Sequence, residues 1–103
     1  MRLVFKNIKN SSLNLMRSAG YSFVRMDNKT GEEEFKRRLS GADYPKFHAF
    51  VKADRDSVSV NLHLDQKKPS YGGYTAHSGE YEDSEILGKE VQRIKRIFEN
   101  QPY

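Results

Sequence analysis

The strongest constraint in this sequence is a regular alternation of apolar and polar side chains between Val58 and Asp65. Successive side chains of a β-strand point to opposite faces of a sheet, so this pattern predicts a strand that is buried on one face only. The preceding stretch, Phe47 to Ala53, also places apolar residues at alternate positions. The polar turn Asp54-Arg55-Asp56 separates the two runs, and together they predict an antiparallel hairpin.

Burial of one face restricts the register of this hairpin, because a slip of one residue would turn every apolar side chain outward. The core side would take Phe47, Ala49 and Val51 from the first strand, with Val60, Leu62 and Leu64 from the second. A two-residue loop at Arg55-Asp56, or a four-residue loop from Asp54 to Ser57, then places His48 directly opposite His63. A slip of two residues would make them diagonal neighbours on the same face. We therefore expect the two imidazoles side by side on the polar face.

The N-terminal part of the chain carries weaker signals. Met1 to Ile8 is either a short strand or an extended arm, and Asn10, Ser11 or Ser12 can cap the helix that follows. The inner side of this helix would use Leu13, Met16 and Leu15, and Gly20 would end it. Tyr21 to Asp27 alternates again, and Asn28 to Gly31 predicts a type I turn closed by a glycine at positive φ.

Two structures compete for residues 32–39. A strand from Glu33 to Leu39 would return from the turn, with Phe35 and Leu39 on one face together with Glu33 and Arg37. The order of charges, three glutamates after Thr30 and then Lys36 to Arg38, is also that of a capped helix. We favour the strand and keep the helix as the alternative.

The C-terminal region predicts an amphipathic helix that begins at Asp83 or Ser84. Its apolar stripe is Leu87, Val91, Ile94 and Phe98, widened by Ile86 and Ile97. The outer side carries Lys89, Arg93 and Arg96, which we expect to be an ordinary solvated face.

Size and composition fit one α+β domain spanning residues 1–103. We expect two layers, an antiparallel sheet of three or four strands covered on one face by an N-terminal and a C-terminal helix. The absence of cysteine suits a reducing compartment, and no apolar run approaches the roughly 20 residues that cross a bilayer. We therefore expect a cytoplasmic protein without membrane contact. The net charge of +4 favours anionic partners.

A long segment without periodicity, Gln66 to Glu82, indicates a binding loop. Its tyrosines could stack on unpaired bases while its lysines meet phosphates, and Gly72 and Gly73 permit close backbone approach. The alternative is an ordered loop whose tyrosines pack back onto the sheet. With a lysine from the hairpin, the predicted nucleic-acid-binding residues are Lys52, Lys67, Lys68, Tyr71, Tyr74, His77 and Tyr81.

Two histidines on one sheet face could also cleave RNA. One of His48 and His63 would remove the 2′-hydroxyl proton and the other would protonate the leaving oxygen, since imidazole titrates near neutral pH. Lys46, Lys52 or Lys67 could stabilise charge on the phosphoryl group. This chemistry needs no metal or other cofactor. The alternative is that the two histidines only pair across a solvated sheet face.

Two other classes of function stay open. His63, Asp65 and His77, with Glu80, could ligate zinc or manganese in a small metal-dependent enzyme. Exposed aromatic side chains and a strand edge could instead serve a non-enzymatic protein-interaction module.

The order of motifs resembles small HicA-type messenger-RNA interferase toxins. Ala19-Gly20-Tyr21 follows a short helix, Phe47-His48-Ala49-Phe50 places a histidine on a strand, and Val58 to His63 ends another strand in Leu-His. The resemblance implies a double-stranded-RNA-binding-like fold with three antiparallel strands between two helices. It also implies His48 as the catalytic residue and an antitoxin-type protein partner. Lys46-Phe47 stand where that family carries Gly-Ser or Gly-Thr.

Overall fold

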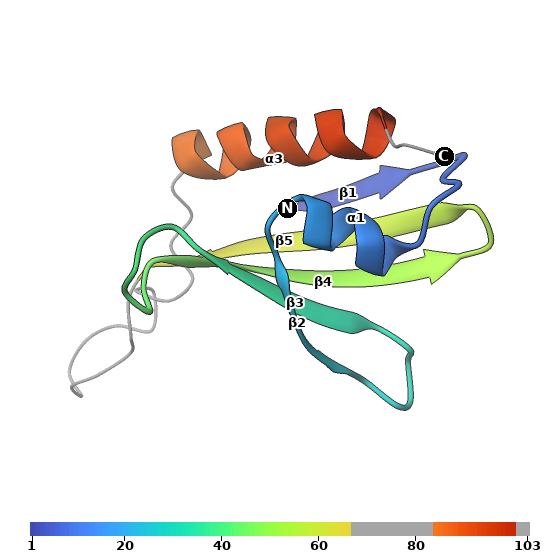
Figure 1. Ribbon diagram of the computed structural model, residues 1–103, viewed down its shortest axis with the longest axis horizontal. Coiled ribbons are helices and arrows are strands. Elements are labelled where there is room, and N and C mark those ends of the chain that lie inside the picture. The colour runs from blue at the N-terminus through green and yellow to red at the C-terminus, as the bar shows by residue number, and fades with distance from the viewer. Residues whose placement is uncertain (67–83, 101–103) are drawn as a thin grey trace.

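The computed structural model describes residues 1–66 and 84–100, and these form an α+β fold (Figure 1). The predicted class is confirmed. In chain order the elements are β1 (Arg2–Phe5), α1 (Ser12–Ser18), β2 (Ser22–Met26), β3 (Glu33–Arg38), β4 (Lys46–Asp54), β5 (Ser57–Asp65) and α3 (Ser84–Glu99).

The sheet has five strands in the order β1-β5-β4-β3-β2, and all neighbours are antiparallel. The expectation of three or four strands was wrong because the N-terminal segment forms a true strand on the outer edge of β5. Leu3 pairs with Val60 and Phe5 with Val58, and the Phe5 ring stacks on Phe98 at 4.6 Å between centroids. Four strands, rather than the three implied by the resemblance, therefore lie between the helices.

The β4–β5 hairpin has the predicted register. Asp54 pairs with Ser57 across a two-residue loop, and His48 pairs directly with His63. Arg55 in this loop adopts a left-handed conformation with φ of 59°. The apolar residues predicted for the core side of both strands are all buried.

Residues 33–38 form a strand, so the helical alternative for this segment was wrong. Phe35 decides the matter, because it is fully buried and pairs with Ala49 in the centre of the sheet. Leu39 lies just past the strand and is 39% exposed, so it does not share the buried face of Phe35. A bulge between Phe23 and Arg25 interrupts the pairing of β2 with β3, which the sequence did not indicate.

The turn before β3 is stabilised by side-chain capping. The Asp27 carboxylate accepts hydrogen bonds from the backbone N–H groups of Lys29 and Thr30, which hold the pKa of Asp27 below its usual range. Gly31 closes the turn with φ of 77°, as predicted.

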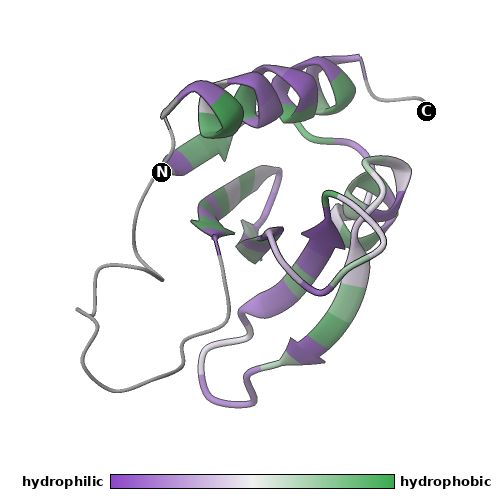
Figure 2. Cartoon of the chain, turned by 90° about the vertical axis from the view of Figure 1, so that its left-hand side faces the viewer, coloured by the Kyte–Doolittle hydropathy of each residue, from purple (hydrophilic) through white to green (hydrophobic). Residues whose placement is uncertain are grey.

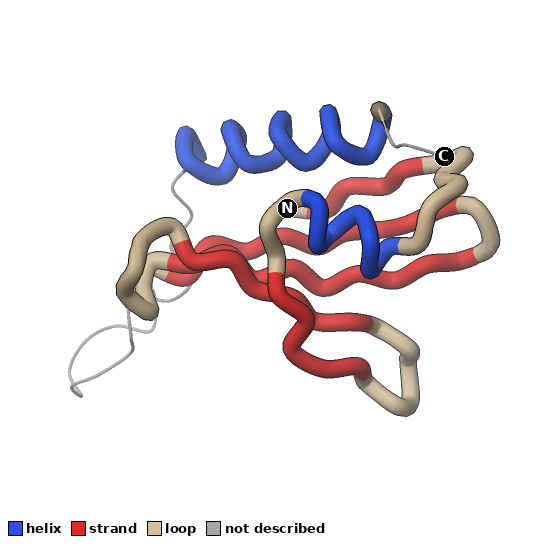
Figure 3. Tube along the Cα trace, viewed as in Figure 1, coloured by secondary structure: helices blue, strands red, loops and turns tan. Residues whose placement is uncertain are grey.

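Both helices cover the same face of the sheet, because their buried side chains and those of the strands form one cluster (Figure 3). Ser11 caps α1, its hydroxyl accepting a hydrogen bond from the backbone N–H of Asn14 at 3.0 Å. Figure 2 shows apolar and polar stretches mixed along α3, as expected for an amphipathic helix. The predicted α3 stripe is buried, with Leu87, Ile94 and Phe98 fully enclosed.

A buried carboxylate ties α3 to the rest of the fold. Glu90 is 5% exposed and accepts a hydrogen bond from the Tyr21 hydroxyl at 2.6 Å. Arg93 donates to both oxygens of Glu90, at 2.9 and 2.8 Å, and to the backbone carbonyl of Ala19 at 2.6 Å. Arg37 of β3 lies 3.6 Å from the same carboxylate. The expectation that Arg93 belongs to a solvated face was therefore wrong, whereas Lys89 and Arg96 are exposed.

The contacts around Glu90 explain the direction in which the pKa values of Glu90 and Tyr21 are shifted. Burial alone would raise the pKa of Glu90, but hydrogen bonds from Arg93 and Tyr21 and the charges of Arg93 and Arg37 leave it below its usual range. Burial, followed by the hydrogen bond to Glu90, raises the pKa of Tyr21 far above its ordinary value, so this tyrosine remains the donor.

Among residues 1–66 and 84–100, no helix is long and apolar enough to cross a membrane.

We predict that Glu90→Gln destabilises the protein by about 2 kcal/mol at neutral pH, because two arginines lose a partly buried counter-charge. A carboxyl with a lowered pKa in the folded state adds stability above its unfolded pKa, about 4.3, and loses it as pH falls through the folded value. The difference between the wild type and E90Q should therefore shrink below about pH 4.

Urea unfolding monitored by circular dichroism at pH 7 and pH 3.5 measures both effects. Glu99→Gln removes an exposed carboxylate from the same helix and should shift stability by no more than about 0.5 kcal/mol. Equal urea midpoints for E90Q and the wild type at pH 7 would contradict the role of this network.

Candidate nucleic-acid interface

The face of the sheet opposite the two helices, here called the open face, is built from the alternate residues that the core does not use. The strand registers pair these residues with one another across neighbouring strands, so they form one continuous surface over all five strands. Its central members are His48, Phe50 and Lys52 of β4 and Ser59, Asn61, His63 and Asp65 of β5; flanking members are Arg2 and Val4 of β1, Lys46 and Asp54 of β4, Glu34, Lys36 and Arg38 of β3, and Ser22 and Arg25 of β2.

His48 and His63 lie opposite each other on this face, as predicted, but their surroundings differ. The Nδ1 atom of His48 lies 2.5 Å from Oδ2 of Asp65, and its Nε2 atom lies 3.6 Å from Oε2 of Glu34. A carboxylate only accepts hydrogen bonds, so Nδ1 of His48 carries the proton of this pair. His48 is held in one orientation with 23% of its side chain exposed, whereas His63 is exposed.

Asp65 was considered in the sequence only as a metal ligand beside His63, yet its partner is His48 on the neighbouring strand. The β4–β5 register explains this contact. Asp65 pairs with Lys46, which lies two residues before His48, so Asp65 and His48 are diagonal neighbours on one face. Glu34 was not foreseen, because its position opposite Phe50 depends on the β3–β4 register, which the sequence left open.

Phe50 is the main residue that sequence reasoning missed. Its ring lies at the centre of the open face, 5.9 Å from the ring of His63 in an edge-on arrangement and 6.3 Å from that of His48. The side chain is half-buried, so part of the ring is accessible. A signal existed in the sequence: between Phe47 and Lys52, Phe50 is an apolar residue at a position of the polar face. Such a ring is a surface on which an unpaired base can stack.

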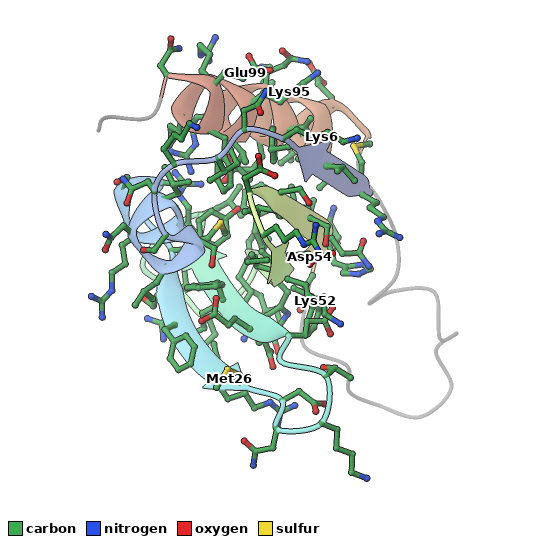
Figure 4. All side chains as sticks on the ribbon, turned by 90° about the vertical axis from the view of Figure 1, so that its right-hand side faces the viewer. Lys6, Met26, Lys52, Asp54, Lys95 and Glu99 are labelled. Atoms are coloured by element: carbon green, nitrogen blue, oxygen red, sulfur yellow. The ribbon has the colours of Figure 1, made fainter. Side chains whose placement is uncertain are left out.

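Basic side chains surround this aromatic centre. Lys52, one of the predicted nucleic-acid-binding residues, is exposed on the open face, close to the β4–β5 turn and well apart from Lys95 and Glu99 of α3 (Figure 4). Arginines and lysines from other strands join it, and the open face carries six basic side chains against three acidic ones: Arg2, Arg25, Lys36, Arg38, Lys46 and Lys52 against Glu34, Asp54 and Asp65. The face therefore has an excess of positive charge.

Some of these cations have partners within the protein. Arg25 donates from Nε to Glu34 at 3.0 Å, but 77% of its side chain is exposed. Arg38 lies 3.4 Å from Asp43, and Nζ of Lys46 lies 4.5 Å from the centre of the Tyr44 ring. Such exposed pairs are weak and can exchange for a phosphate group.

The predicted loop residues lie outside the described part of the chain: Lys67, Lys68, Tyr71, Tyr74, His77 and Tyr81. Within residues 1–66 and 84–100, no group of three or more histidine, cysteine, aspartate or glutamate side chains could hold a metal ion. The metal site proposed from His63, Asp65 and His77 depends on a residue outside those ranges and stays a prediction.

No protein-family model matches this sequence, and no curated protein and no solved structure is significantly similar to it. The chemistry of the open face is therefore the basis for a functional assignment.

Proposed function

We propose that this protein binds RNA or another single-stranded nucleic acid on its open face. One observation supports the proposal above the others: a partly accessible aromatic ring, Phe50, lies beside the paired imidazoles of His48 and His63 on a face with an excess of basic side chains. Aromatic rings stack on bases of any sequence, and lysines and arginines neutralise phosphates. The lysines and tyrosines of segment 67–82 would add contacts of the same two kinds.

Other ligand classes fit this surface less well. An acidic protein would use the positive charge but has no need of a flat ring among histidines. A protein-interaction module finds its best support elsewhere, on edge strand β2, where Phe23, Val24 and Met26 are 43%, 40% and 52% exposed. An antitoxin-type partner, which the HicA resemblance implies, would be of this kind.

Binding through phosphates predicts a steep dependence on salt. We expect the affinity for a labelled single-stranded RNA to fall as salt rises, with Lys36→Gln and Lys52→Gln each lowering the slope of log K against log salt by about one. Arg96→Gln removes one charge from the exposed side of α3 and should leave the slope unchanged. Fluorescence anisotropy at several salt concentrations measures these slopes.

Binding that is insensitive to salt, or that weakens equally in R96Q and K52Q, would argue against an interface on the open face. It would favour the protein-interaction module instead.

The contact between His48 and Asp65 favours a second candidate function, metal-independent cleavage of RNA on the same face. With Nδ1 directed at Asp65, the Nε2 atom of His48, which lies 3.6 Å from Oε2 of Glu34, would accept the 2′-hydroxyl proton. The 2′-oxygen then attacks phosphorus, the bond from phosphorus to the 5′-oxygen breaks, and His63 protonates that leaving oxygen. The products are a 2′,3′-cyclic phosphate and a free 5′-hydroxyl.

For this candidate, we predict cleavage of RNA in the presence of a chelator and none of the matching DNA, which lacks the 2′-hydroxyl. His48→Ala and His63→Ala should each reduce the rate by roughly 10²-fold or more, the usual contribution of a general acid or base. Gel analysis of end-labelled RNA measures the rate, and circular dichroism checks that the variants fold. A fully active H48A would refute the catalytic role of His48. If the wild type binds RNA but leaves it intact, the cleavage proposal is refuted and the binding proposal is not.

A further inference from the structure

We propose that a single strand crosses the open face perpendicular to the β-strands, with one base stacked on Phe50 and one phosphate near each edge of the sheet. This inference rests on the proposed function and specifies the ligand as unpaired nucleic acid. It follows from one continuous row of side chains that spans the whole sheet, which we call the transverse row: Arg25, Glu34, Phe50, Asn61 and Arg2.

The transverse row takes one residue from every strand. Arg25 pairs with Glu34 and Glu34 pairs with Phe50. Phe50 pairs in turn with Asn61, and Asn61 with Arg2. The aromatic ring thus lies on the central strand and an arginine lies on each edge strand. At the usual strand spacing the row is about 19 Å wide, a distance that a few nucleotides can span.

Each position of the row suits a different part of a nucleotide. Phe50 offers a ring face without hydrogen-bonding groups, so it accepts any base by stacking. Asn61 is exposed beside it and carries both a donor and an acceptor, which can meet the edge of that base. Arg2 is exposed at one edge and Arg25 at the other, and each can donate to a phosphate.

Glu34 lies between Phe50 and Arg25 and restricts where a phosphate can bind. Its carboxylate faces both Arg25 and His48, so a phosphate directly above it would be repelled. The guanidinium of Arg25 keeps its outer donors accessible. The hollow beside it is lined by Arg25, Lys29 and Phe50, but also by the carboxylates of Asp27, Glu32 and Glu34. The phosphate next to the stacked base is therefore expected at the exposed donors of Arg25 at the sheet edge, outside this acidic hollow.

Neighbouring rows of the open face lack this combination. The row through His48 and His63 continues to Lys36 and Ser22, and the row through Lys52 continues to Ser59 and Val4, but neither holds a phenylalanine between two arginines. A duplex keeps its bases stacked on each other and cannot offer one to Phe50. The transverse row therefore favours a single strand over a duplex of the same sequence.

The test uses the full chain and labelled oligouridylates of two, four, six and eight nucleotides, with an RNA duplex as the competing ligand. We expect affinity to rise up to about four nucleotides and then to level off, apart from a statistical increase for longer strands. Phe50→Ala and Phe50→Leu should each weaken binding about tenfold without changing the salt slope, and Phe50→Tyr should retain it. Arg2→Gln and Arg25→Gln should each lower the slope by about one, with Arg96→Gln as the matched control.

A direct readout does not depend on deletion of the ring. The chain contains no tryptophan and six tyrosines, so Phe50→Trp introduces a single tryptophan at the stacking position, whose emission can be excited selectively above the absorption of tyrosine. Its emission should be quenched by the single strand and not by the duplex, and thermal unfolding verifies that each variant folds.

The two proposals fail in distinguishable ways. If the wild type binds no oligonucleotide at low salt, the proposed function and the transverse row are both wrong. If the wild type binds RNA but F50A and F50L bind as tightly, if F50W emission is unchanged by a bound strand, or if the duplex binds as well as the single strand, the interface stands and the transverse row is overturned.

Discussion

The register of the β4–β5 hairpin is the constraint on which the rest of the structure depends. It aligns apolar residues of both strands under the helices and, in the same step, sends His48, Phe50 and His63 to the other face. A slip of one residue would bury two imidazoles and expose Val60 and Leu62, which would desolvate polar rings and lose buried apolar surface. The candidate site is thus a consequence of the way the core is buried.

The polar groups on the two faces of the sheet differ in how far they are paired within the protein. On the helix side, Glu90 is enclosed and shared by Tyr21, Arg37 and Arg93, so its charge is compensated within the fold. On the open face His48 is held by Asp65 and Arg25 donates to Glu34, but most cations of this face remain accessible. The polar groups beneath the helices are satisfied within the fold, whereas the exposed cations of the open face are available to a ligand.

Residues whose position follows from local alternation could be predicted from sequence. The pairing of His48 with His63 and the burial of the α3 stripe are of this kind, because a period of two or of about 3.6 residues defines a face by itself. Phe50 was predictable by the same rule, as the apolar residue at a polar-face position, but was overlooked. The strand Arg2–Phe5 was ambiguous because its apolar run is short, and its stacking partner Phe98 is distant in sequence. Arg93 was misjudged, and Glu90 was not considered, because a charged residue on a helix is usually solvated. Only the packing of Tyr21 and Ala19 against α3 shows otherwise.

The central claim is that the face opposite the helices binds nucleic acid, and side-chain NMR of the labelled protein titrated with unlabelled single-stranded RNA tests it most directly. The account predicts that the resonances of the Phe50 ring, the His48 and His63 imidazoles and the Asn61 amide shift together and saturate together. Those of Met16, Leu87 and Ile94, beneath the helices, should stay unchanged. Shifts confined to exposed residues of α3 or to Phe23, Val24 and Met26 of the edge strand, with the open face unaffected, would contradict it.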